Sequence, residues 1–160
     1  MTPITQAAAI ACITVGTGAA AVSVMNEDIP DLVVPEAAWT AGHELDGKSF
    51  FINAELDNGA TGETDTIVFK DGQFISMDCE EYCNFGLSDY QTWTDGTVIH
   101  FTSVAKCRTA PHTVVWHGQV VGDQVSVEMS WTTRRWYWTH QINGIAEGTR
   151  LPQGESAVSG

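Results

Sequence analysis

The chain has 160 residues, with 7 basic side chains against 20 acidic ones and a formal net charge of −13. This length supports one domain with a modest hydrophobic core, which a covalent brace would help to stabilise. The excess of carboxylates would repel phosphates, so we exclude nucleic acid as a partner. It favours solubility, or contact with a basic soluble protein.

The first predicted element is an uncharged segment, residues 4–25, which is rich in alanine and threonine. At about 1.5 Å of rise per residue, a helix of this length crosses a hydrocarbon core about 30 Å thick. A cleaved secretory signal normally opens with basic residues, but no lysine or arginine precedes Lys48. We therefore expect residues 1–25 to form a retained, single-pass transmembrane anchor. A cleaved signal segment is the alternative.

Small side chains recur at every fourth position of this predicted helix, at Ala8, Cys12, Gly16 and Ala20. A stripe of small residues lets two transmembrane helices approach closely. We expect this stripe to pack against a helix of an integral membrane protein subunit.

Two segments flank the predicted domain. Residues 26–46 contain Pro30, Pro35 and six acidic residues, which predicts an extended linker. Residues 151–160 are small and polar, and we expect them to form a disordered tail.

Residues 47–150 are typical of a β domain, with short β-forming stretches between tight turns and no amphipathic helix. The two-residue hairpin signals are Asp71-Gly72, Asp95-Gly96 and Gly122-Asp123. Strands are expected near residues 48–56, 64–70, 73–79, 89–94 and 97–106, followed by three more.

The last three strands can be paired from the sequence. A turn at Gly122-Asp123 places Trp116 opposite Met129 and Val114 opposite Trp131, so that the apolar residues of both strands share one face. A further turn at residues 132–135 would continue that face into the last strand. The predicted barrel interior includes Trp116, Trp131, Trp136, Trp138 and His140.

About eight antiparallel strands in sequential order close most economically into an up-and-down barrel, which has no exposed edge. The hairpin rhythm of residues 48–150 resembles the calycin group, which contains the lipocalins, the fatty-acid-binding proteins and the avidins. Gly47-Lys48-Ser49-Phe50 stands where a lipocalin would carry Gly-x-Trp, so the resemblance implies a fold and not a ligand. A rolled sandwich is the alternative fold.

Tracing the strands brings four of the seven basic residues to one end of the barrel: Lys106, Arg108, Arg134 and Arg135. Arginine and aromatic residues are enriched at the energetic centres of interfaces. Arg108, Arg134, Arg135 and Tyr137 are therefore the candidate interface or ligand rim. The alternative is that the arginines only solvate a turn.

The same tracing places Cys83 and Cys107 together, which predicts a disulfide and leaves Cys79 over. Cys79 is the alternative partner of Cys107. A disulfide would place the domain on the oxidising side of a membrane. A zinc site made of Cys79, Cys83, Cys107 and His112 is less favoured, because no second closely spaced pair of ligands follows. We expect no metal and no cofactor.

The sequence contains no nucleotide, haem or catalytic motif, so we expect a protein that is not an enzyme. The first hypothesis is a single-pass protein of the bacterial inner membrane with its β-barrel in the periplasm. It would be an accessory or stabilising subunit of a larger membrane complex, for example a respiratory or photosynthetic one. The alternative is a periplasmic calycin-like module that binds a small apolar or anionic ligand.

Overall fold

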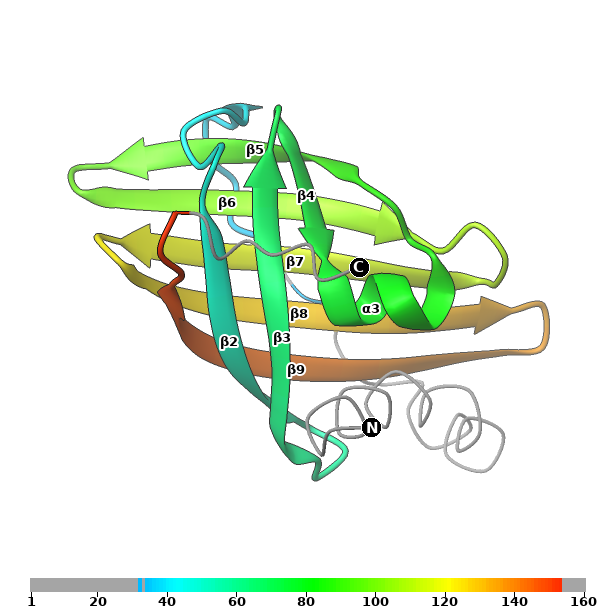
Figure 1. The fold of residues 1–160 in the computed structure, drawn as a ribbon. Coiled ribbons are helices and arrows are strands. Elements are labelled where there is room, and N and C mark those ends of the chain that lie inside the picture. Colours follow the sequence, from blue (N-terminus) through cyan, green and yellow to red (C-terminus); the bar gives the residue numbers. More distant parts are fainter. Residues whose placement is uncertain (1–31, 33, 154–160) are drawn as a thin grey trace.

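The computed structural model describes residue 32 and residues 34–153, and Figure 1 shows their arrangement. Its elements are β1 (Thr40–Ala41), β2 (Ser49–Leu56), β3 (Thr61–Lys70), β4 (Gln73–Ser76), α3 (Met77–Cys83), β5 (Ser88–Asp95), β6 (Val98–Lys106), β7 (His112–Val121), β8 (Gln124–Arg135) and β9 (Trp138–Arg150). The predicted anchor and its stripe of small residues lie outside this part of the chain. Among the described residues, no helix is long and apolar enough to cross a membrane.

The strands β2 to β9 form a closed antiparallel ring in sequential order, and β9 completes it by pairing with β2 (Figure 1). Phe50 pairs with Arg150 at one end of this seam, and Leu56 pairs with Gly144 at the other. The ring confirms the predicted eight-stranded, antiparallel up-and-down barrel and excludes the rolled sandwich.

The hairpin turns follow the chemistry of their residues. Asp71 and Gly72 have φ angles of 52° and 76°, a left-handed pair that matches the twist of the flanking strands. At the turn between β7 and β8, Trp116 pairs with Met129 and Val114 with Trp131, as predicted.

The turn between β8 and β9 differs from the prediction. Residues 132–135 continue β8, and the turn is formed by Trp136 and Tyr137. Thr133 pairs with His140, which places His140 in the interior at 5% exposure. Trp136 is 94% exposed, so its assignment to the interior is wrong. Trp138 lies on the same face of β9 as the inward-facing His140, but it is only half-buried because it lies beyond the end of the ring.

Aromatic side chains fill the interior of the barrel. Phe69 is fully buried, and its ring centroid lies 4.9 Å from that of Phe101 and 5.0 Å from that of Tyr90. Phe74 lies 5.3 Å from Phe69 and 5.3 Å from Trp116, so the rings form one continuous cluster. These close-packed rings occupy much of the barrel interior among the described residues.

The helix α3 interrupts the predicted strand at residues 73–79, which ends at Ser76. Ser76 caps the helix by accepting a hydrogen bond from the backbone N–H of Cys79, and Asn84 ends it in the left-handed conformation. Tyr82 and the following Phe85 pack on Trp131 with centroid distances of 5.8 and 5.2 Å. The helix therefore covers one end of the barrel.

A disulfide joins Cys83, the last residue of α3, to Cys107 in the loop after β6. The two residues are 24 positions apart, and their Cα atoms are 5.8 Å apart. Cys79 is buried on the same helix and is not part of the bond. The bridge ties the helical cap to the neighbouring loop.

Part of the predicted linker belongs to the barrel. The short strand β1 pairs with β5 through Thr40 and Thr92. Leu45 is fully buried, its backbone N–H donates to the Tyr90 hydroxyl, and that hydroxyl donates to Asp46. The extended segment therefore ends near Trp39, where the chain begins to pack on the sheet.

Candidate functional site

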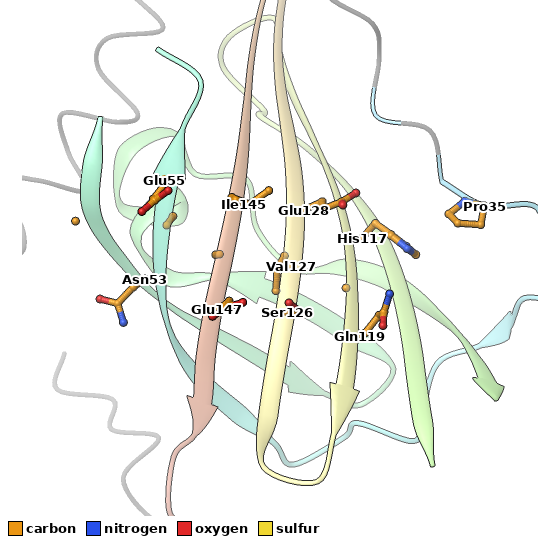
Figure 2. Close-up of a pocket in the computed structure, with 14 residues that line it drawn as sticks. Pro35, Asn53, Glu55, His117, Gln119, Ser126, Val127, Glu128, Ile145 and Glu147 are labelled. Carbon is orange, nitrogen blue, oxygen red and sulfur yellow. The ribbon is translucent and has the colours of Figure 1, made fainter. Parts of the chain in front are cut away.

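A groove of about 920 Å³ crosses the outer face of β2, β9, β8 and β7, and Figure 2 shows the side chains that line it. Two cross-strand rows form its floor. The first row runs Glu55, Ile145, Glu128 and His117, and the second runs Asn53, Glu147, Ser126 and Gln119. Adjacent strands are about 4.8 Å apart, so each row spans about 15 Å.

The groove is acidic around an apolar centre. Glu55, Glu128 and Glu147 are exposed, and none of them has an ion-pair partner among the described residues. No lysine or arginine occurs among the described residues that line the groove. Ile145 is 61% exposed between two of the carboxylates. The surface therefore matches a partner that carries positive charge beside apolar area.

His117 closes one end of the first row and is only 7% exposed. Trp39 packs edge-on against its ring at 5.9 Å, and His100 stacks on it at 6.3 Å. Burial lowers the pKa of His117, so the neutral ring is favoured at neutral pH. The nearby Glu128 and the Phe101 backbone oppose this shift without reversing it.

The Nδ1 atom of His117 is buried and has no hydrogen-bond partner among the described residues. Leaving a buried polar atom unpaired costs about 1–3 kcal/mol. His117 lines the groove, so a partner bound there would lie beside its ring. The ring therefore carries a hydrogen-bonding atom that the described residues leave unused.

The comparisons with known proteins give distant matches of fold. No protein-family model and no curated protein matches the chain. The chain is similar to the apo form of intact afifavidin, with 16% identity and a TM-score of 0.39 over 71% of this chain and 88% of that one. It is similar to the rhizavidin–biotin complex, with 17% identity and a TM-score of 0.37 over 69% of this chain and 98% of that one. A short afifavidin–biotin complex gives 19% identity and a TM-score of 0.35 over 66% of this chain and 89% of that one.

The structure places the residues of the predicted rim at one end of the barrel. Arg108, Arg134, Arg135 and Tyr137 are all exposed there. The backbone N–H of Arg134 donates to the Pro111 carbonyl, which holds the loop after β6 beside the end of β8. The less favoured zinc alternative loses two of its four ligands, because Cys83 and Cys107 bond to each other.

The residues of the groove were not predicted. Ser126 and Glu128 alternate with buried valines in the sequence, a signal that could have placed them on the outer face. The local sequence pattern does not predict that they lie beside Asn53 and Glu55. Those two residues come next to them only because β2 pairs with β9.

A second group of carboxylates lies where β3 meets α3. Asp65 accepts hydrogen bonds from the Ser76 hydroxyl at 2.5 Å and from the Asp78 backbone N–H at 3.1 Å. Desolvation, with added repulsion from Asp78, raises the pKa of Asp65 from 3.8 to about 7. Glu63 is also buried, its Oε2 has no hydrogen-bond partner among the described residues, and desolvation raises its pKa too. Both carboxyl groups therefore hold their proton more tightly in the folded chain than they would when exposed to water.

We expect Asp65→Asn to change how stability depends on pH. The raised pKa means that the folded chain holds the Asp65 proton more tightly than the unfolded chain. The contribution of Asp65 to the unfolding free energy is therefore full below pH 3.8 and is lost as the pH rises towards about 7. Measured by urea unfolding across this range, the free energy of unfolding should fall more steeply with pH for the wild type than for Asp65→Asn. The asparagine keeps an acceptor for the Asp78 backbone N–H.

The exposed Asp95 provides the matched control. Asp95→Asn should keep the wild-type dependence on pH. Parallel curves for the wild type and Asp65→Asn would show that Asp65 does not hold the proton.

Proposed function

We propose that the chain is a non-catalytic, single-pass protein of the bacterial inner membrane whose periplasmic barrel acts as an accessory subunit of a larger membrane protein complex. In this proposal the groove on the outer face of β2, β9, β8 and β7 binds a basic surface of a protein partner. The observation that carries the proposal is the buried Nδ1 of His117, which has no hydrogen-bond partner among the described residues, in a groove lined by carboxylates that form no ion pair with them.

Two features support the placement in the periplasm. Residues 4–25 are uncharged and long enough to form an anchor. The disulfide between Cys83 and Cys107 suits an oxidising compartment.

The filled interior is the reason for preferring a protein partner to a small ligand. A barrel that holds a small apolar or anionic molecule needs space between its inward side chains. Here Phe69, Phe74 and Phe101 are each no more than 1% exposed and contact one another. The outer groove is open, and charge complementarity would both select and orient a basic partner.

Site-specific crosslinking in the membrane fraction of cells tests the proposal. The photoreactive residue p-benzoylphenylalanine in place of Ile145 would stand at the centre of the groove. We expect it to give one adduct of defined mass with a partner that carries a basic surface. Adding Glu128→Gln and Glu147→Gln should reduce the yield about tenfold, because two charge contacts are lost.

Val104 offers a matched control, because it is an aliphatic residue on the outer face of β6 and is 49% exposed. The same photoreactive residue at position 104 should give no such adduct. Equal crosslinking yields at positions 145 and 104 would reject the groove as the binding surface. A yield at position 145 that does not change on adding Glu128→Gln and Glu147→Gln would reject it too.

A further inference from the structure

The tip of the β8–β9 hairpin exposes large aromatic side chains. Trp136 is 94% exposed and Tyr137 is 60% exposed, while Trp138 is half-buried. Their ring centroids lie 4.8 Å apart for Trp136 and Tyr137 and 6.0 Å apart for Tyr137 and Trp138. The ring contacts of Trp136 and Tyr137 within the described part of the chain are confined to this trio. Exposed aromatic area of this size is unfavourable in water unless a contact covers it.

The tip projects beyond the ring of strands. The pairing of β8 with β7 ends at Thr133, so Arg134 and Arg135 extend past β7. The pairing of β9 with β2 begins only at Gly144, so residues 138–143 extend past β2. In Figure 1 the β8–β9 turn accordingly forms the right-hand extremity of the barrel. The aromatic trio therefore sits on a convex finger and not in a groove.

Positive charge collects directly behind the finger. Arg134 and Arg135 are exposed at the end of β8. Lys106 and Arg108 lie in and beside the adjacent loop, which the hydrogen bond from Arg134 to Pro111 holds against the hairpin. Four of the seven basic residues of a chain with 20 acidic ones are thus at this end.

We propose that this finger inserts into the lipid–water interface of an anionic bilayer. Tryptophan and tyrosine prefer that interface because each combines an apolar ring with a polar group that stays hydrated. Arginines one residue behind the rings would lie at the level of the lipid phosphates, to which they donate paired hydrogen bonds. Each basic residue near an anionic surface favours the bound state by about fivefold.

Two observations favour a bilayer over a protein pocket. Aromatic anchors of protein interfaces sit in a ring of other contacts that excludes water, whereas this trio stands alone on a projecting turn. Charges more than about 8 Å from the finger are screened at physiological ionic strength, so the side chains close to it, basic and acidic alike, decide its electrostatic attraction to the bilayer. The proposal is independent of the groove, which lies at residues 126–128 and 145–147 of the same strands.

Quenching of tryptophan fluorescence by brominated lipids tests the insertion. The full chain is incubated with, or reconstituted into, vesicles of brominated phosphatidylcholine, with or without brominated phosphatidylglycerol. We expect strong quenching of the wild type, stronger with phosphatidylglycerol, and loss of most of it in Trp136→Phe/Trp138→Phe. The loss of quenching in Trp136→Phe/Trp138→Phe reports the position of the finger whether or not residues 4–25 also insert.

The control is Trp93→Phe, because Trp93 is half-buried against His100 near the end of β5 away from the finger. This variant should be quenched like the wild type. Arg134→Gln/Arg135→Gln should remove the added quenching by phosphatidylglycerol, which corresponds to about a 25-fold weaker preference for the anionic surface.

Three results would overturn the proposal. If brominated lipids do not quench the wild-type fluorescence, the finger does not insert into the bilayer, and a protein contact becomes the explanation for its exposed rings. Quenching that persists unchanged in Trp136→Phe/Trp138→Phe would place the inserted tryptophan elsewhere. Equal quenching with and without phosphatidylglycerol would reject the anionic surface.

Discussion

Phe69→Ala should lower the free energy of unfolding by about 3–5 kcal/mol, the range for removing a buried phenylalanine. Phe69 is fully buried, and its ring meets those of Phe50, Phe74, Tyr90 and Phe101. The surrounding strands belong to a closed ring and cannot collapse freely into the space, so most of the cavity should persist. Urea unfolding of the full chain measures the loss.

The matched control is Phe51, a half-buried neighbour of the inward Phe50 on β2. Phe51→Ala should lower the free energy of unfolding clearly less than Phe69→Ala, because less of the Phe51 ring is removed from water on folding. Phe69→Ala should also bind a benzene-sized apolar molecule in its cavity, as dry engineered cavities do. Wild-type binding of the same molecule would show that the interior is not filled and would favour the ligand-binding alternative.

Removing the disulfide should have the second-largest effect. Cys83→Ser and Cys107→Ser should each lower the free energy of unfolding by about 3 kcal/mol, the loop-closure entropy for residues this far apart. That is a sizeable share of the ~5–15 kcal/mol typical of a domain. The reduced wild type should behave like either variant in the same unfolding experiment.

The double variant distinguishes a bridge from two independent thiols. Cys83→Ser/Cys107→Ser should lose no more than either single variant, because one bond cannot be lost twice. Additive losses would contradict the bridge. Cys79→Ser should lower the free energy of unfolding less than Cys83→Ser or Cys107→Ser, because Cys79 is buried on α3 and is not part of the disulfide.

The strands of the last hairpins could be predicted because residues close together in the sequence determine both their pattern and their pairing. Val125, Val127 and Trp131 share one face with period two, and the two-residue turn at Gly122 fixes the register of β7 against β8. The disulfide followed from the same meander, since the order of the strands decides which loops share an end. The β8–β9 turn was misplaced because Thr132 and Thr133 suit a strand as well as a turn.

The short helix α3 was missed for a related reason. Ser76 followed by Asp78 and Glu80 is a helix-start signal, but the apolar residues before it continue a strand pattern. Hydrogen bonds from Ser76 and Asp78 to Asp65, which lies on another strand, help to set the start of the helix. A contact between strands cannot be read from the segment itself.

The sequence by itself determined the alternation of buried and exposed residues, the turns at Asp71-Gly72 and Gly122-Asp123 and the end at which the basic residues gather, because these follow from local pattern and the order of the strands. The turn after Asp95 lies one residue later than predicted, at residues 96–97. Only the tertiary structure decided the candidate sites. Closure of β2 on β9 brings Glu55 beside Ile145 and so builds the acidic groove across four strands. Unequal strand lengths leave Trp136 and Tyr137 beyond the ring. Both outcomes depend on which strands meet and where their pairing stops, and pairing between distant strands is fixed only when the barrel closes.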